Sequence, residues 1–384
     1  MLSGLLLFSA ESISQISNVV SSMASSMVDA IPESMILKDQ FTVTFGASLM
    51  MPLTPLFKVY HGTKLAQLGV DNIDAERSKK ELDISYEVTD VYLKLVYAQL
   101  MTDVAKEAKD TIDKHVELAQ KYEDVGMLSH SDVLAAKVEA IKAQQNIVEA
   151  ENSTRLAALK LAQVLAVGKN TALRASDMPQ DEIHVSLESL DYYQELALQN
   201  RTEFKQLNIA RQAADKRKTI AYLDYIPQLF LVGRYQFEHG IDVLKPQNQA
   251  FVGLGMTWTI FDGLKHYHEA EKAQADASQY SAKADEAKEL IELDVAQKYL
   301  ALQTAIERVK LTKEALALAD ENLRTINAQF AQGESVNTDV LAAQTRRTAA
   351  KADDVKARID ILTSVAQLKL SSGLSPDLDD NAFE

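Results

Sequence analysis

The residue types that most often bind metals or transfer protons gather in one short segment, His266-Tyr267-His268-Glu269, directly after Asp262-Gly263. Imidazole and carboxylate groups could bind a divalent metal, but two histidines that lie two positions apart point to different sides of a helix. The chain has no cysteine and no glycine-rich phosphate loop, nucleophile elbow or HExxH motif. We therefore expect neither an enzyme nor a metal or cofactor site.

Carboxylates also recur beside two glycines at which long helices would reverse. Asp132 follows Gly126, and Asp339 follows Gly333, in each case by six positions. Each aspartate either begins the returning helix, where its charge favours the helix dipole, or contributes to an acidic ring at a helical tip. The residues suited to N-cap the returning helices are Ser131 and Thr338.

The two glycines belong to an internal duplication. A shift of 207 positions, the distance from Gly126 to Gly333, brings the second half of the chain onto the first without a gap. The matches include Gly46 with Gly253, Lys58 with Lys265, Tyr60-His61 with Tyr267-His268, and DVLAA at 132–136 with DVLAA at 339–343. Each half therefore reads as a strand, a long helix, a turn and a second helix.

Heptad patterns predict the long helices. Apolar residues recur every seven positions over 84–119 and again over 295–330, a spacing typical of coiled coils. The first long helix is expected from about Thr63 to Tyr122. No proline interrupts residues 247–375, so a helix from Leu264 to Phe330 could be about 100 Å long.

Alternating apolar residues predict strands at Phe41–Met51, Leu229–Phe237 and Phe251–Phe261, with a fourth in the apolar segment 5–10. The start of the chain is a poor secretory signal, and we expect that the chain starts late, truncated at its N-terminus and without its signal peptide. No apolar run reaches the roughly 18 residues of a membrane-spanning helix. Strands of about ten residues can cross a bilayer, but an open sheet edge in lipid is costly, so several chains would have to share one barrel. The alternative is a small soluble sheet beside a coiled coil.

The net charge of −15 argues against nucleic acid as a partner. The expected division of the chain is a first strand pair with an extracellular loop at 1–62, a helical hairpin at 63–167, a connector at 168–190, a helix at 191–224, a second strand pair at 225–263, a second hairpin at 264–373 and a disordered acidic tail at 374–384.

Four segments carry a resemblance to a known family: TWTIFDG before the second long helix, the turns VGMLSHSDVLAAK and AQGESVNTDVLAAQ, and YLDYIPQLFLVGRYQF before the second strand pair. Over nearly its whole length the chain resembles the outer membrane efflux protein (TolC-like) family. The resemblance implies a mainly α fold with some β structure: a homotrimer whose long coiled-coil hairpins form an α-barrel, with four strands per protomer in a shared 12-stranded transmembrane β-barrel.

The resemblance also implies a function and partners. The protein would lie in the outer membrane of a Gram-negative bacterium, with its helical part in the periplasm. It would be a passive exit duct, docked to a periplasmic adaptor and an inner-membrane pump, in tripartite multidrug efflux or type I secretion. The alternative function is a soluble periplasmic coiled-coil scaffold or adaptor.

The resemblance points to three groups of site residues, with departures from the family pattern. Ala342 stands where the family has a second aspartate, and Phe330 and Ser335 replace a tyrosine and an arginine that lock the helices. The expected periplasmic entrance comprises Asp132, Asp339, Phe330 and Ser335. The expected adaptor-contacting turns comprise Gly126, Gly333, Val133, Leu134, Val340 and Leu341. The strand–helix junction comprises Asp262 and Gly263.

Overall fold

The computed structural model describes residues 18, 21, 22, 25, 43–168, 173–176, 185–239 and 248–377. The chain divides into two compact units. One unit holds the strands, in residues up to Tyr60 and Tyr222–Leu264, and the other holds the long helices, in His61–Ala221 and from Lys265 onward. The strand expected at 5–10 lies outside the described residues.

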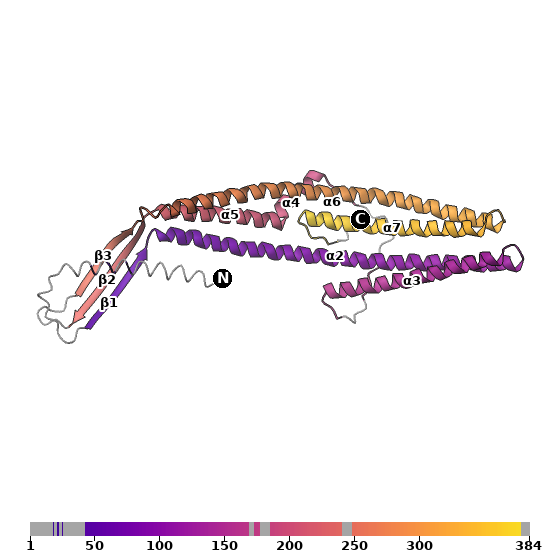
Figure 1. Cartoon of the computed structure of the whole chain (residues 1–384), viewed down its shortest axis with the longest axis horizontal. Coiled ribbons are helices and arrows are strands. Elements are labelled where there is room, and N and C mark those ends of the chain that lie inside the picture. Colours follow the sequence, from indigo (N-terminus) through magenta and orange to yellow (C-terminus); the bar gives the residue numbers. More distant parts are fainter. Residues whose placement is uncertain are drawn as a thin grey trace. The chain divides into compact units, whose positions relative to one another are not determined.

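The described strands form one antiparallel sheet in the order β1-β2-β3 (Figure 1), with β1 at Val43–Pro52, β2 at Gln228–His239 and β3 at Asn248–Thr257. The three predicted strands are confirmed, but the expected end of the third, at Phe261, is wrong. Thr257 pairs with Gln228, the first residue of β2. Pro227 precedes it and has no backbone N–H, so the ladder cannot continue past Thr257.

The register of the sheet gives it one apolar face. Met51, Leu231 and Leu254 lie side by side across the three strands. Because side chains alternate between faces, the residues in register with them share this face. Its exposed members are Val43, Phe45, Leu49, Met51, Leu229, Leu231, Tyr235, Val252, Leu254 and Met256. The opposite face is mixed: it carries Thr44, Ser48, Arg234, Gln236 and Gln249 together with the apolar residues Met50, Phe230, Val232 and Phe251.

The first strand-to-helix junction is held by Thr54. Its hydroxyl donates to the Pro227 carbonyl (3.0 Å) and accepts from the backbone N–H of Leu229 (2.8 Å). Helix α2 (Pro55–Asp124) begins immediately afterwards, so the predicted start near Thr63 is wrong. Proline suits the first helical position, because its missing N–H has no partner there and its φ is already helical.

The second junction has a different geometry, since Thr54-Pro55-Leu56 stands in the first copy where the second has Phe261-Asp262-Gly263. Gly263 and Leu264 adopt left-handed φ angles of 72° and 67° before helix α6 (Lys265–Ala331) begins. Seven residues thus separate the end of β3 from α6, whereas only two separate β1 from α2. At this point the two copies differ both in sequence and in backbone conformation.

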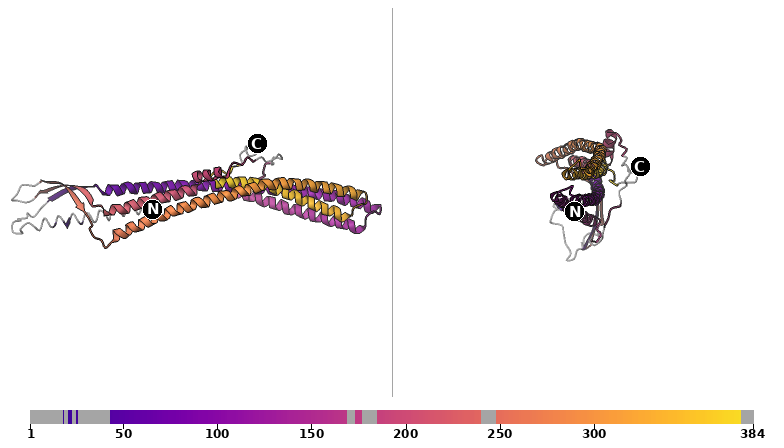
Figure 2. Two further views of the ribbon diagram at one scale, coloured as in Figure 1. Left: turned by 90° about the horizontal axis from the view of Figure 1, so that it is seen from above. Right: turned by 90° about the vertical axis from the view of Figure 1, so that its right-hand side faces the viewer.

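The helical unit contains two long antiparallel hairpins (Figures 1 and 2). Helix α2 turns into α3 (His130–Val164), and α6 turns into α7 (Asn337–Ser371). Two shorter helices, α4 (Leu190–Asn200) and α5 (Thr202–Tyr222), connect the halves. None of the described helices carries a stretch of 18 residues that is apolar enough to cross a membrane.

Two apolar clusters form the core of the helical unit. The larger one joins α4, α6 and α7 and includes Val295, Leu302 and Leu368, while the smaller one joins α2 to α7 through Leu93 and Leu362. The predicted heptad seam of α6 is confirmed at its buried positions, which are Val295, Leu302, Leu323 and Phe330. The α2 seam is confirmed at Ala98 and Ala119 but not at Ile84, which is 55% exposed.

The predicted disorder of the tail is wrong for its first residues. Pro376 is fully buried. Asp377 accepts a hydrogen bond from the Ser85 hydroxyl (3.1 Å) through its carboxylate and one from the Lys369 ammonium (2.7 Å) through its carbonyl. The acidic composition of this segment predicted disorder, but the apolar ring of Pro376 packs against the rest of the protein and holds the segment in place. The rest of the tail lies outside the described residues.

Candidate functional site

The turns at the ends of the two hairpins have the same backbone geometry. Gly126 and Gly333 adopt φ angles of 77° and 76°. The Met127 N–H donates to the Tyr122 carbonyl (2.8 Å), and the equivalent Glu334 N–H donates to the Gln329 carbonyl (2.9 Å). A left-handed glycine closed by such a bond is a usual end of an α-helix. Both glycines are exposed.

Asp132 is a helix-capping residue. Its carboxylate accepts from the backbone N–H of Ser129 (3.3 Å), while the Ser129 hydroxyl accepts from the Asp132 N–H (3.2 Å), which forms a capping box at the start of α3. The N-cap is therefore Ser129, and the prediction of Ser131 is wrong. The turn between Gly126 and α3 is therefore two residues shorter than a cap at Ser131 would make it. The helix begins at the first residue whose side chain can accept from its free N–H groups.

Asp339 is exposed and lies in the first turn of α7. The Ser335 hydroxyl donates to its carboxylate (3.3 Å). The N-cap of α7 is Val336, which offers no side-chain hydrogen bond, so the prediction of Thr338 is wrong. Asp339 therefore keeps much of its negative charge open to solvent, unlike the capping Asp132.

The DVL segments that follow the two aspartates divide into buried and exposed residues. Val133 is 0% exposed and Val340 is 3% exposed, so neither can touch an adaptor in this fold, and these two predicted contacts are wrong. Leu134 is 48% exposed, and Leu341 is intermediate. The valines pack inward because they lie on the helix face that meets the neighbouring helices.

Phe330 is an internal packing residue. It is 4% exposed, and its ring lies 5.2 Å from that of His115 and 5.5 Å from that of Tyr122, both on α2. His115 Nε2 is 2.7 Å from Asn337 Oδ1, and the Asn337 amide donates to the Asp132 carbonyl (2.9 Å). Burial lowers the pKa of His115, against the opposing effect of the Asn337 hydrogen bond. A neutral histidine thus links α2 through α7 to α3.

A group of ion pairs that sequence reasoning missed joins the two hairpins. Arg347 on α7 donates to Glu107 on α2 (2.7 Å) and also pairs with Asp320 on α6, while Lys351 pairs with the same glutamate. Burial acts to raise the pKa of Glu107, but hydrogen bonds from Lys351 and Arg347 outweigh it and lower that pKa. Because these contacts connect both hairpins, separating the hairpins would break them.

The repeat holds a signal that could have revealed Arg347. Its counterpart in the first hairpin is Ala140, and the counterpart of Lys351 is Gln144. Arg347 and Lys351 lie one helical turn apart, and only the second copy has cations at these positions. This difference between the copies indicates a contact that the second copy alone makes. Asp320 has the equivalent Asp113 in the first hairpin, so this acid alone does not mark the contact.

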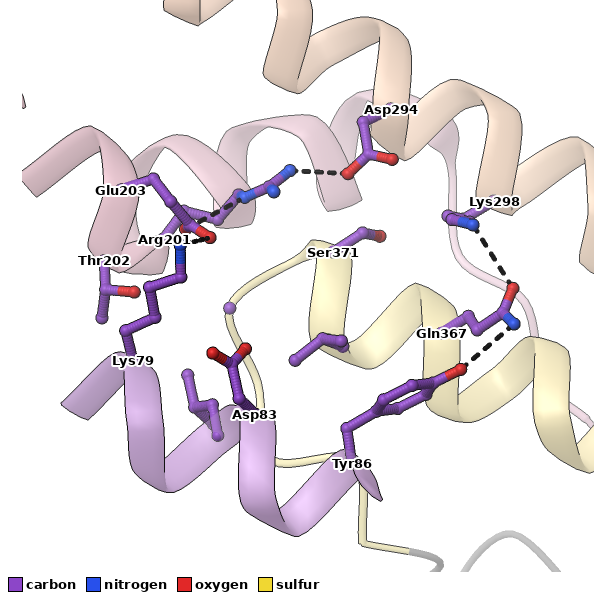
Figure 3. A pocket seen from close by; sticks show the side chains of 13 residues that line it. Lys79, Asp83, Tyr86, Arg201, Thr202, Glu203, Asp294, Lys298, Gln367 and Ser371 are labelled. Atoms are coloured by element: carbon purple, nitrogen blue, oxygen red, sulfur yellow. Dashed lines mark hydrogen bonds and ion pairs between the residues drawn. The ribbon is translucent and has the colours of Figure 1, made fainter. Parts of the chain in front are cut away.

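A pocket of about 280 Å³ lies beside the C-terminal end of α7 and is also lined by residues of α2 and α6 (Figure 3). Arg201 donates to Asp294 (2.7 Å), Lys79 pairs with Glu203 (3.3 Å), and Gln367 donates to the Tyr86 hydroxyl (3.2 Å). Its lining charges are three cations, Lys79, Arg201 and Lys298, and three anions, Asp83, Glu203 and Asp294. Since most of these groups already pair with one another, the pocket reads as a joint between helices.

Arg201 also marks a break that the sequence did not predict. One helix was expected at 191–224, but Arg201 (ψ 124°) separates α4 from α5. Gly373, with φ 73°, approaches so closely that a Cβ there would lie 2.8 Å from the Arg201 nitrogen. The end of α7 therefore lies against the break between α4 and α5.

Two exposed apolar stripes follow the outer faces of α3 and α6. The α3 stripe comprises Leu134, Val138, Ile141, Val148, Leu156 and Leu159, and the α6 stripe comprises Leu290, Leu293, Leu300, Leu311 and Leu318. At 100° per residue, each set falls within an arc of about 80°. Within the described residues neither stripe is covered by another element. Exposed polar residues interrupt both arcs, among them Gln145 and Asn152 on α3 and Thr304 and Arg308 on α6. Spaced rows of exposed apolar side chains still suit contacts between helices of neighbouring proteins.

Comparison with known proteins gives one family match and several similar structures. The family model described as outer membrane efflux protein matches residues 23–167 and 193–374. The channel VceC of Vibrio cholerae has a TM-score of 0.71 at 16% identity, covering 88% of this chain and 87% of that one. The open-state MtrE channel of Neisseria gonorrhoeae has a TM-score of 0.67 at 15% identity, covering 94% and 86%. For CmeC of Campylobacter jejuni these values are 0.65, 13%, 89% and 80%. No curated protein sequence matches the chain.

Proposed function

The chain belongs to the outer membrane efflux protein family, and from that premise we propose that three copies form a passive exit duct that serves a periplasmic adaptor and an inner-membrane pump. Membership makes the protein an outer-membrane efflux channel with a helical periplasmic part, and not an enzyme. The proposal adds the trimer, the partners and the route through a tripartite efflux or type I secretion system.

The observation that carries the proposal is the apolar face of the sheet. Leu49 and Leu254 on this face are 75% and 76% exposed, whereas the other face bears Arg234 and Gln236. A sheet with one lipid-facing and one water-facing side alternates in this way. Within the described residues β1 and β3 are the outer strands, and their edges must be paired if they lie in lipid. Neighbouring copies, and the expected strand at 5–10, would supply the pairing of a shared 12-stranded barrel.

The two apolar stripes support assembly of the helical part. A chain that carries two different contact surfaces can form a closed ring when each copy presents one surface to the next. We therefore propose that the α3 stripe of one protomer packs against the α6 stripe of its neighbour. Coiled-coil packing across this contact would continue the seams that already hold α6 against α7.

The hairpin tips are the proposed periplasmic entrance. Asp339, which is exposed, contributes negative charge there, and Asp132 chiefly caps α3. Gly126 and Gly333 are exposed tip residues available to an adaptor, whereas Leu134 belongs to the α3 stripe that packs against the neighbouring protomer. The Arg347 and Lys351 ion pairs with Glu107 hold the entrance closed, since opening it requires that α7 move away from α2.

The test is the mass of the full chain extracted in detergent, together with its conductance in a planar bilayer. A conducting trimer is expected. Leu300→Arg places a charge in the α6 stripe and should abolish the trimer, while Gln303→Arg, an exposed position outside the stripe, should leave it intact. Circular dichroism checks that both variants are folded. A smaller assembly mass for a folded Leu300→Arg variant then shows a defect in assembly and not in folding.

The contrary outcome is equally clear. A monomer that dissolves without detergent and does not conduct would favour the soluble scaffold or adaptor. A trimer that forms equally well with arginine at 300 would show that the α6 stripe does not mediate assembly.

A further inference from the structure

Arg234 lies in the middle of β2, on the mixed face of the sheet, opposite the apolar one. The antiparallel register places it directly between Ser48 on β1 and Phe251 on β3. All three side chains are exposed, and side chains alternate between the two faces of a strand. Arg234 therefore points away from the side of the sheet that carries Leu49 and Leu254.

No carboxylate neutralises this guanidinium. Arg234 has no ion-pair partner among the described residues. Its cross-strand neighbours, and the same-face residues two positions along on each strand, carry no charge. The three described strands contain one acidic residue, Glu238, which lies four positions farther along β2, about 13 Å away. The positive charge thus acts on whatever fills the space on this side of the sheet.

In the proposed trimer, the mixed face becomes the inner wall of one barrel, so three copies of Arg234 would line it. Twelve strands about 4.8 Å apart and tilted by about 40° enclose a wall of about 12 Å radius. A side chain that extends inward from this wall brings its charge within about 10 Å of the axis, which is the Debye length at about 0.1 M salt. Charges of one sign at that range raise the local concentration of anions and lower that of cations.

We propose that Arg234 is a specificity-determining residue, whose three copies form a positively charged ring that favours the passage of anionic solutes. Rings of arginine or lysine select anions in other pores. The proposal rests on the proposed function, because it needs the shared barrel, and it adds the charge class of the substrate. The net charge of the chain is −15, so this preference must come from the local charge on the wall.

The first experiment measures the reversal potential across a planar bilayer under a gradient of potassium chloride. Arg234→Gln should lower the chloride-to-potassium permeability ratio about threefold near 0.1 M salt. The change should become small at about 1 M salt, where the Debye length falls to about 3 Å. Arg234→Lys keeps the charge and should keep the ratio. Arg211→Gln, which removes an exposed cation from α5, should also keep it.

The second experiment needs no current. Because the chain has no cysteine, Ser48→Cys places a single thiol directly opposite Arg234. In liposomes this thiol should react with both anionic and cationic methanethiosulfonates. Combining it with Arg234→Gln should lower the ratio of the anionic to the cationic rate about fivefold. Leu49→Cys is the matched control, since it is the next residue of β1 but lies on the apolar face, and it should react slowly with both reagents.

An unchanged permeability ratio in Arg234→Gln, or an unchanged ratio of the two rates, would overturn the proposal. The control thiol reports on the proposed function separately. If Leu49→Cys reacts as fast as Ser48→Cys, the apolar face does not lie in lipid, and the shared barrel and the ring both fail. If Leu49→Cys is protected while neither ratio responds to Arg234, the barrel stands and the charged ring fails.

Discussion

Replacing Arg347 by methionine should loosen the contact between the two hairpins. Methionine replaces the apolar stem of the side chain but removes the guanidinium and its charge, so packing around the stem changes little. The lost contacts are those to Glu107 on α2 and Asp320 on α6. Lys351 still pairs with Glu107 in the variant, which keeps that carboxylate from being left without a partner.

The size of the effect follows from the exposure of the pairs. The Arg347 side chain is 18% exposed, but the two carboxylates are 38% and 47% exposed, so solvent screens them in part. About 1 kcal/mol for each pair is therefore reasonable, or about 2 kcal/mol in total. That is a factor of about 30 in the closed-to-open equilibrium of each protomer. An equilibrium of about 100:1 for the closed state would become about 3:1.

Single-channel recording in planar bilayers measures this shift as open probability. The matched control is Arg324→Met, which makes the same chemical change. Arg324 is 78% exposed and pairs with Glu321 on its own helix, so it holds no hairpins together. If Arg347→Met records like Arg324→Met and like the wild type, the ion pairs do not hold the entrance closed and the reasoning is wrong.

Three further predictions concern Glu107, Gly373 and the two aspartates at the hairpin tips. Acid should open the channel, because the pKa of Glu107 is lowered in the folded protein. The ion pairs of Glu107 are complete above its unfolded pKa and are lost as the pH falls through its folded pKa. Open probability that does not respond to acid, or a Glu107→Gln variant that responds as the wild type does, would contradict this. Gly373→Ala should lower the thermal midpoint and cost at least about 2 kcal/mol of stability, because φ is 73° and the new Cβ would meet the backbone between α4 and α5. Gly62→Ala, in a helix with open space around its Cβ, should instead stabilise the protein by up to about 1 kcal/mol. Equal thermal midpoints of the two variants would refute the close approach at Gly373. Alanine at both Asp132 and Asp339 should weaken block of the current by added cations. Asp339→Asn alone should retain most of that effect and leaves intact the capping box of α3, which is worth about 1 kcal/mol. Unchanged block would show that these carboxylates do not lie at the entrance.

The repeating features of the chain could be predicted well. Heptads place Val295, Leu302 and Phe330 inside because a helix turns the same face inward every seven residues. Strands with period-two patterns place Leu229, Leu231 and Tyr235 on one face, as observed. These patterns depend on local backbone geometry alone, and the duplication supplied each of them twice.

The ends of elements were predicted less well. The capping residue of α3 is Ser129 and not Ser131, and that of α7 is Val336, which makes no side-chain cap at all. Ser129 and Ser131 both have the right chemistry, so the choice depends on where the turn after Gly126 can close. The end of β3 likewise depends on its partner strand, since Thr257 pairs with the first residue of β2.

By itself, the sequence determined the duplicated strand and hairpin unit, the faces of the strands, the family and the outer-membrane efflux role. Only the tertiary structure decided which side chains meet between hairpins. Arg347 and Glu107 are separated by 240 positions, and their pairing requires that α7 and α2 have one particular rotation and one axial offset. The same is true of the surroundings of Arg234, because an alternating pattern predicts the face on which a residue lies but not which residues of the neighbouring strands will lie opposite it.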